Sequence, residues 1–228
     1  MIRNFEDFLG VKDRLLYIGS IIETMLINSV KALVERKEVF LNSVEVQREE
    51  AEKVRKELDE KCIVLIATHQ PAANGLRFLT SAMKIAGELE KTSRQVRNLS
   101  LSSGKILSSF VQFHISDIAE LADTAKAMLR DCLDAFVRKD EQLALSVLHR
   151  GVRAGKIKEK ILKELPAIME TEKKNYAQCA ELLLIACYLE MIAWNAVNVA
   201  EDVLFMLNIS KTVSPNPESS PVVFSFNN

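Results

Sequence analysis

Two acidic residues lie within apolar helical stretches of the sequence, and each could serve as a metal ligand or as a proton donor and acceptor. Glu190 is flanked by Leu183, Cys187, Trp194 and Val197 at steps of three and four residues, so a helix would place all five on one face. Because an unpaired charge on such a face is very costly, the carboxylate must meet a cation, bind a proton or turn toward a polar seam.

Glu90 holds an equivalent place 100 residues earlier, and two interpretations of the two glutamates remain open. Each could be presented to a metal or a regulatory ligand, or each could be paired with a basic residue of its own helical bundle. For Glu90 we favour the pairing, because Arg94 follows at i+4. For Glu190 the pairing requires a cation from another helix.

Other kinds of site find little support in the sequence. The Glu-x-x-His pairs of di-iron bundles are absent, since Ile66, Val111 and Ser146 stand three residues before His69, His114 and His149. The sequence also lacks a glycine-rich phosphate loop, a G-x-S-x-G elbow and a Cys/His array with zinc spacing. We interpret the histidines as helix-surface or helix-end residues, Trp194 as a volume-filling side chain, and the charged run at residues 47–53 as a solvated helix face.

Composition narrows the class of protein further. The chain has 228 residues and 48% apolar content with only seven glycines and five prolines, which favours helices over an all-β fold. Its 30 basic and 31 acidic residues give a net charge of −1, so no electrostatic footprint for nucleic acid is present. The four cysteines lack C-x-x-C spacing, which indicates reduced packing residues of a cytoplasmic protein.

One stretch, residues 182–200, is long and apolar enough to suggest a membrane span. Glu190 at its centre, together with Asn195 and Asn198, would make insertion costly, and no basic flank sets an orientation. We therefore expect a buried helix of a soluble protein, with no direct membrane insertion.

Apolar periodicity predicts six long helices. Their stripes cover residues 8–33, 41–65, 76–99, 107–136, 143–169 and 176–207. Pro71 should end the second helix near residues 69–70, a loop is expected at residues 100–104, and a turn at residues 138–140. In the fifth helix Gly151 and Gly155 are unfavourable, and Pro166 should kink or break it.

The two halves of the sequence resemble each other. Ile85, Ala86, Leu89, Glu90 and Asn98 recur as Ile185, Ala186, Leu189, Glu190 and Asn198, and residues 32–37 parallel residues 135–139 at a slightly different offset. We expect an all-α fold of two tandem, spectrin-like three-helix bundles, at residues 1–104 and 105–208. Residues 209–228, rich in Pro, Ser and Asn, are interpreted as a flexible or loosely docked tail.

Two stretches of the chain resemble the PhoU family of phosphate-uptake regulators. Residues 70–77 read Q-P-A-A-N-G-L-R and residues 84–90 read K-I-A-G-E-L-E, close to the family's Q-P-x-A-x-D-L-R and K-I-x-x-D-L-E-R-I-G-D. Residues 185–190, I-A-C-Y-L-E, and residues 198–201, N-V-A-E, repeat the match to I-A-R-Y-L-E-R-I-A-D and N-I-A-E. The resemblance extends over about residues 5 to 207.

The family's motif places two carboxylates one helical turn apart, which suits a multinuclear iron or zinc site on each bundle. In this sequence the second carboxylate is replaced twice, by Arg94 and by Trp194, and Gly75 stands for the aspartate of the D-L-R turn. We therefore expect the motif positions Glu90, Arg94, Glu190 and Trp194 to hold no metal cluster, with no cofactor and no catalytic residue.

The resemblance implies a non-enzymatic cytoplasmic adaptor that restrains phosphate uptake and the phosphate-starvation response. Its partners would be the ATPase of the phosphate ABC importer and the sensor histidine kinase, and a homodimer is expected. Three alternatives remain open: a metal-binding module of the same fold, a paralogue that regulates a different transporter, and an enzyme that uses Glu190 as acid or base. The enzyme would need a solvent-open cleft at Glu190, whereas the adaptor predicts that Glu190 is sealed and paired.

Overall fold

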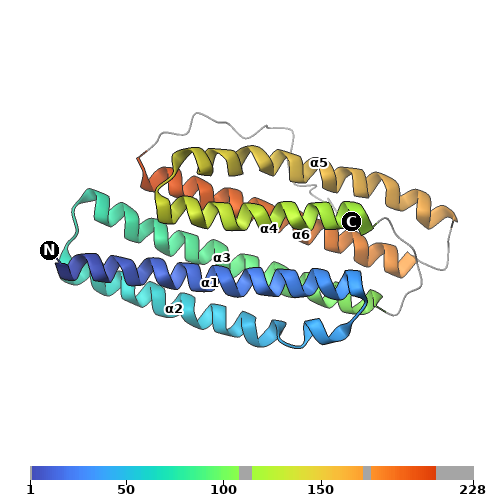
Figure 1. Cartoon of the computed structure of the whole chain (residues 1–228), viewed down its shortest axis with the longest axis horizontal. Coiled ribbons are helices and arrows are strands. Elements are labelled where there is room, and N and C mark those ends of the chain that lie inside the picture. The colour runs from blue at the N-terminus through green and yellow to red at the C-terminus, as the bar shows by residue number, and fades with distance from the viewer. Residues whose placement is uncertain (1, 108–114, 172–175, 209–228) are drawn as a thin grey trace, which may run out of the picture.

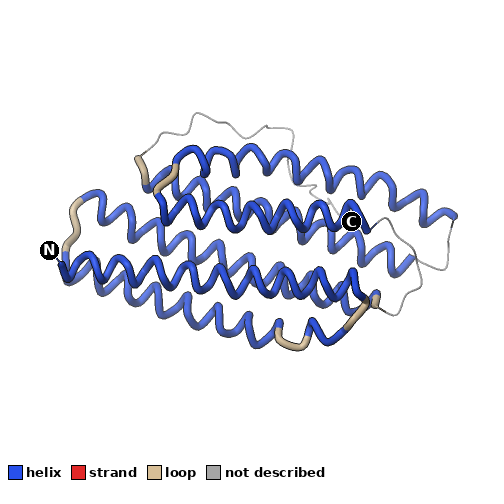
Figure 2. Tube along the Cα trace, in the orientation of Figure 1, coloured by secondary structure: helices blue, strands red, loops and turns tan. Residues whose placement is uncertain are grey.

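The structure, a computed structural model of the chain, describes residues 2–107, 115–171 and 176–208, and these ranges fold into six α-helices and one 3-10 turn. The elements are α1 (Ile2–Glu35), η1 (Glu38–Leu41), α2 (Val44–His69), α3 (Ala73–Ile106), α4 (Ile115–Arg138), α5 (Glu141–Thr171) and α6 (Tyr176–Met206). All six helices run along the long axis of the molecule (Figures 1 and 2). The prediction of an all-α fold is confirmed.

The helices form two three-helix bundles that lie side by side. α1, α2 and α3 pack against one another, and so do α4, α5 and α6. The central helices α3 and α6 pack together along the middle of the molecule, and α1 also contacts α4 (Figure 1). α3 and α6 therefore contribute to both the bundle cores and the contact between the bundles.

The buried stripes show that the two bundles are copies of each other. In α2 the buried residues include Val44, Ala51, Val54, Leu58 and Cys62, and in α5 Val147, Ala154, Ile157, Ile161 and Leu165 are buried at a constant offset of 103 residues. In α3 and α6 the buried Ile85, Ala86 and Leu89 match Ile185, Ala186 and Leu189 at an offset of 100. Because the same register is buried in both copies, equivalent positions can be compared residue by residue.

An aromatic junction ties the first bundle to the second. The Phe78 ring of α3 meets Phe8 of α1 edge-on at 5.2 Å between centroids and stacks on Phe136 of α4 at 5.4 Å. Phe136 is fully buried. Such pairs stabilise beyond their buried area, so this contact helps to fix the two bundles relative to each other.

Several helix ends follow the sequence prediction. α2 stops at His69, and Gln70 takes a left-handed conformation with φ 43° directly before Pro71. α4 ends at Arg138, and Lys139 is left-handed with φ 57°, which confirms the predicted turn there. A left-handed residue directly after a helix is a common way to end it.

The loop predicted at residues 100–104 is wrong, because α3 continues to Ile106. Ser100, Ser102 and Ser103 are buried within the helix, and the Ser100 hydroxyl donates to the Arg97 carbonyl. Small hydroxyl side chains that bond to their own helix backbone can be buried without breaking it. Leu107, predicted to begin the fourth helix, instead follows the end of α3, and its N–H donates to the Gly104 carbonyl at 3.5 Å.

Of the two effects predicted for Pro166, a kink or a break of the fifth helix, the break does not occur. Pro166 lies inside the helix and does not break it, since α5 runs on to Thr171. The predicted tail, residues 209–228, lies outside the described residues, as do Val111 and His114.

Two helices are long and apolar enough to cross a membrane by length and composition alone. They are residues 8–35 of α1 and the whole of α6, and half of each apolar window is buried inside the protein. α6 packs against α3, α4 and α5, so a position among three helices accounts for its apolar composition.

Candidate functional site: two paired glutamates

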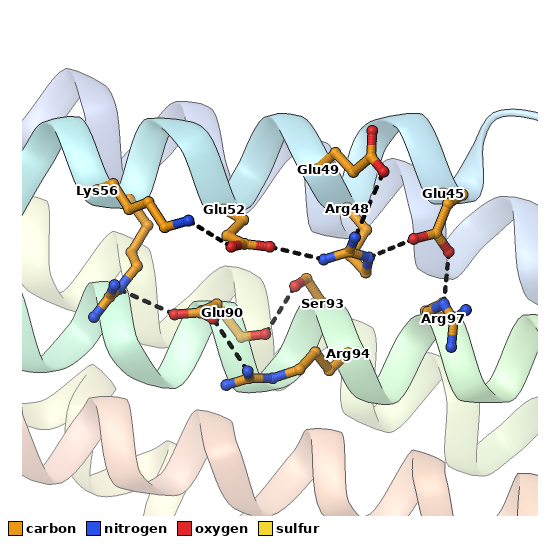
Figure 3. Close-up of polar contacts among 10 residues, drawn as sticks. Glu45, Arg48, Glu49, Glu52, Lys56, Glu90, Ser93, Arg94 and Arg97 are labelled. Carbon is orange, nitrogen blue, oxygen red and sulfur yellow. Dashed lines mark hydrogen bonds and ion pairs between the residues drawn. The ribbon is translucent and has the colours of Figure 1, made fainter.

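Glu90 lies on α3 where it faces α2, and two arginines hold its carboxylate (Figure 3). Arg94 Nη1, one turn later, lies 3.2 Å from Oε1, which confirms the predicted pairing. Arg55 Nε of α2 lies 3.0 Å from Oε2. The Glu90 side chain is only 16% exposed, so these two cations supply the compensation that a mostly buried charge needs.

Asp59 extends this cluster on the α2 side. Its carboxylate lies 3.1 Å from Arg55 Nη2, so Arg55 is shared between Asp59 and Glu90. Burial raises the pKa of Asp59 above its usual range, and the nearby Glu90 charge acts in the same direction, while Arg55 opposes both. Neither Arg55 nor Asp59 was identified in the sequence.

A network of ion pairs continues from this cluster along α2 (Figure 3). Arg48 donates to Glu45 at 2.7 Å and to Glu52 at 2.9 Å. Arg97 of α3 donates to the other oxygen of Glu45 at 2.6 Å, and Lys56 donates to Glu52 at 2.7 Å. Hydrogen bonds from Arg97 and Arg48 lower the pKa of Glu45.

These contacts refine the prediction for the charged run at residues 47–53. Its Arg48 side chain is mostly buried, whereas Glu49 is exposed and lies 3.8 Å from it. The run is therefore partly a solvated face and partly the polar lining of the α2–α3 seam.

Glu190 occupies the equivalent position on α6 and is paired in the same way. Lys158 Nζ of α5 lies 2.8 Å from Glu190 Oε2, and the Glu190 side chain is 17% exposed. The prediction that its partner comes from another helix is confirmed. Lys158 stands 103 residues after Arg55. An ion pair at equivalent positions therefore joins α2 to α3 in the first bundle and α5 to α6 in the second.

The two seams differ beyond this shared pair. Gly151 and Gly155 stand where the first bundle has Arg48 and Glu52, at the same offset of 103. A Cβ at position 151 would lie 2.8 Å from Val197 and 3.8 Å from the Trp194 ring. Since Gly151 has no side chain, Trp194 and Val197 fill that space, in agreement with the volume-filling interpretation of Trp194.

The contact between α3 and α6 is polar in part. Asn195 donates to the Thr92 hydroxyl at 3.2 Å, and Lys84 lies 3.4 Å from Asp202. Asn198 donates to Glu88 at 3.1 Å. Burial raises the pKa of Asp202, with Lys84 acting against it.

The donor set at either glutamate does not fit the metal cluster that the sequence motif would suggest. Glu90 is approached by two guanidinium groups, and Glu190 is approached by an ammonium group, so each carboxylate already has a counter-charge. Arg94 and Trp194 offer no ligand atom at the second motif position. Within residues 2–107, 115–171 and 176–208, no three His, Cys, Asp or Glu side chains are grouped closely enough to hold a metal ion.

The Cys62 and Cys132 thiols are buried, and two of the histidines lie on helix surfaces. Burial raises the pKa of Cys62 to about 12 and that of Cys132 further still, so both thiols stay protonated at neutral pH. His69 and His149 are exposed on helix surfaces, as predicted. Glu190 is mostly sealed and paired rather than open to a cleft.

Comparisons with known proteins agree with this architecture. A family model described as the PhoU domain matches residues 15–102 and again residues 118–203. The chain is 26% identical over 203 residues to a phosphate-specific transport system accessory protein PhoU homolog of Pseudomonas putida, covering 86% of this chain and 77% of that protein. It is also 26% identical to the homolog of Rhizobium meliloti, covering 93% of this chain and 90% of that protein.

Two solved structures share the fold. The structure of PhoU from Pseudomonas aeruginosa superposes with a TM-score of 0.85 at 23% identity and covers 89% of this chain and 98% of that one. The phosphate transport system regulatory protein PhoU from Streptococcus pneumoniae gives a TM-score of 0.81 at 16% identity, with 90% and 96% covered. The two matched copies of the family domain coincide with the two bundles.

Proposed function

Because this chain belongs to the PhoU family, we propose that it is an accessory protein that regulates phosphate uptake. The observation that carries the proposal is the double match of the PhoU domain, one copy to each bundle. Relatives that align over most of their own length bear the name of phosphate-specific transport system accessory proteins.

The mode of action that we propose is protein contact without catalysis. The partners would be the ATPase of the phosphate ABC importer and the sensor histidine kinase, both met from the cytoplasm, with the regulator present as a homodimer. Long helices with charged outer faces offer extended docking surfaces. Both glutamates that could have been acid or base catalysts are engaged with cations, which supports an adaptor over an enzyme.

We further propose that regulation proceeds without a bound iron or zinc cluster. The support is chemical: a cation at Arg94 would repel a metal ion next to Glu90, and the indole at Trp194 cannot ligate one next to Glu190. The input that this protein senses would then differ from that of family members with the complete motif.

The test is a quantitative pull-down from the organism's own cells. A tagged copy at the native locus is isolated from phosphate-replete and phosphate-starved cells, with the tag alone as bait for the control, and the importer ATPase and sensor kinase are quantified. We expect both partners to be enriched over the control. In parallel, deletion of the gene should derepress a phosphate-starvation reporter in replete medium, and the untagged gene should restore repression.

Recovery of the ATPase of a different transporter, without that of the phosphate importer, would favour a paralogue with a changed target and overturn the proposal. Unchanged reporter activity after deletion would do the same for the role in the starvation response.

A further inference from the structure

The α5–α6 seam differs in chemistry from its counterpart between α2 and α3. Positions that carry Glu45, Glu49 and Lys91 in the first bundle carry Leu148, Val152 and Met191 in the second. Together with Gly151, Gly155 and Trp194 they form what we call the α5–α6 patch. The charged network of Figure 3 is thus replaced by an apolar surface at the same place on the fold.

The patch is open to solvent where its counterpart carries charges. Val152 is 49% exposed and Met191 is 42% exposed. Trp194 is partly buried, packs near Gly151 next to Val152, and follows Met191 by three residues on α6. The packing of Trp194 on Gly151 accounts for the glycine, but it gives no reason for valine and methionine at two exposed positions. Exposed apolar groups that adjoin a large aromatic side chain are typical of a binding surface.

The sequence beyond α6 contains a segment of matching chemistry. Residues 222–226 read V-V-F-S-F and carry no charge. They follow a stretch that contains Pro215, Pro217 and Pro221, a composition typical of a spacer between folded parts. Two phenylalanines at alternate positions suit an apolar groove beside a tryptophan.

The segment can reach the patch on its own molecule. Trp194 lies 12 residues before the end of α6 at Met206, or about 18 Å at the helical rise. The 14 residues from 209 to 222 can extend to about 46 Å, so the spacer has ample slack. A tether of this length also raises the local concentration of the segment to the millimolar range, which allows even a weak contact to form.

We propose that residues 222–226 dock onto the α5–α6 patch of the same molecule and cover Val152, Met191 and Trp194. The tail then shields the seam in which the Lys158–Glu190 pair remains but the wider charged network of the first bundle is replaced by apolar residues. The inference does not depend on the proposed role in phosphate uptake, because it concerns a contact within one chain.

The chain offers a built-in probe for this contact, since Trp194 is its only tryptophan. Phe224→Ser combined with Phe226→Ser, in the full chain, should shift Trp194 emission to longer wavelength and raise its quenching by acrylamide. The matched control is Ser219→Ala combined with Ser220→Ala, which changes the same tail without touching its apolar residues. Far-UV circular dichroism checks that the helices are retained.

A second variant locates the contact on the patch. Met191→Lys introduces the lysine that stands at the equivalent position 91 of the first bundle. With the tail unchanged, this variant should expose Trp194 to solvent. Adding the two Phe→Ser changes to Met191→Lys should then produce little further change, because the contact is already lost. A synthetic peptide of residues 218–228, added to the Phe→Ser variant, should restore the shorter-wavelength emission.

Three outcomes would overturn the proposal. Spectra and quenching that are the same in the Phe→Ser variant and in the control would show that the tail does not cover Trp194. Effects that disappear on dilution of the wild-type chain would assign the patch to a second copy. Fully additive effects of Met191→Lys and the Phe→Ser changes would place the tail elsewhere.

Discussion

Lys158→Met should destabilise the second bundle, because it leaves Glu190 without its cation. Within the part of the chain that the structure describes, Lys158 is the cation paired with Glu190, at 2.8 Å. Removing one partner of a fully buried ion pair costs about 3–5 kcal/mol. Glu190 keeps 17% of its side-chain surface exposed, so water offsets part of the cost, and we expect a loss of about 2 kcal/mol in the free energy of unfolding.

Arg94→Met is the matched control, since it removes a cation from the equivalent Glu90. There Arg55 remains 3.0 Å from the carboxylate, and the lost Arg94 side chain is 57% exposed. An exposed pair of this kind is worth about 0–1 kcal/mol. The two variants therefore delete similar contacts, but only Lys158→Met leaves a mostly buried charge unpaired.

The assay is urea unfolding at neutral pH, followed by far-UV circular dichroism and by Trp194 emission, together with thermal melts. A loss of about 2 kcal/mol corresponds to a melting temperature lower by about 4–8 °C for a chain of this size. Lys158→Met combined with Glu190→Gln should recover most of the lost stability, because the charge itself is then absent. Equal losses for Lys158→Met and Arg94→Met, or no recovery in the double variant, would refute the reasoning.

Three further expectations follow from the same geometry. Gly155→Ala should raise the free energy of unfolding by about 0.5–1 kcal/mol, because its Cβ would meet only Glu190 Oε1 at 3.6 Å. Gly151→Ala should lose this gain, because its Cβ would clash with the Val197 side chain at 2.8 Å. Equal urea midpoints for the two variants would contradict this expectation. Burial raises the pKa of Asp202, so the stability that its protonated carboxyl contributes is present below the unfolded pKa and is lost as pH rises through the folded pKa. Asp202→Asn should therefore become more stable relative to wild type as pH rises from about 3 to about 7. A constant difference in urea midpoint across that range would argue against it. Elemental analysis of the purified protein should find no stoichiometric iron, zinc or manganese. Stoichiometric metal that disappears in the Glu90→Ala plus Glu190→Ala variant would show that the motif positions do bind metal and would refute this expectation.

Local rules accounted for the parts of the structure that depend on neighbours in the sequence. The apolar stripes located six helices, and the i,i+4 spacing identified Arg94 as a partner of Glu90. They failed at residues 100–104, where three serines and a glycine look like a loop. There the Ser100 hydroxyl bonds to its own helix backbone and the small side chains pack in the core, so tertiary contacts outweighed the weak helix propensity.

Partners on other helices were harder to identify, because spacing along one helix says nothing about what faces it. Arg55 and Lys158 were missed for this reason. A signal was present, since both stand at the same register of the second helix in their repeats, 103 residues apart. Extending the repeat from the third helices to the second helices would identify Arg55 and Lys158 as equivalent candidate partners for Glu90 and Glu190 from the sequence alone.

The divergence of the two seams also bears on how the chain assembles. A protein built from two similar bundles can fold wrongly by pairing a helix of one copy with the core of the other, a known hazard of tandem repeats. Here α2 placed against α6 would bring Arg48 onto the Trp194 ring and Glu52 against the Glu190 carboxylate. In the same way, α5 placed against α3 would leave Arg97 without Glu45. Each outer helix is thus matched to its own central helix, and the differences between the copies favour correct pairing during folding.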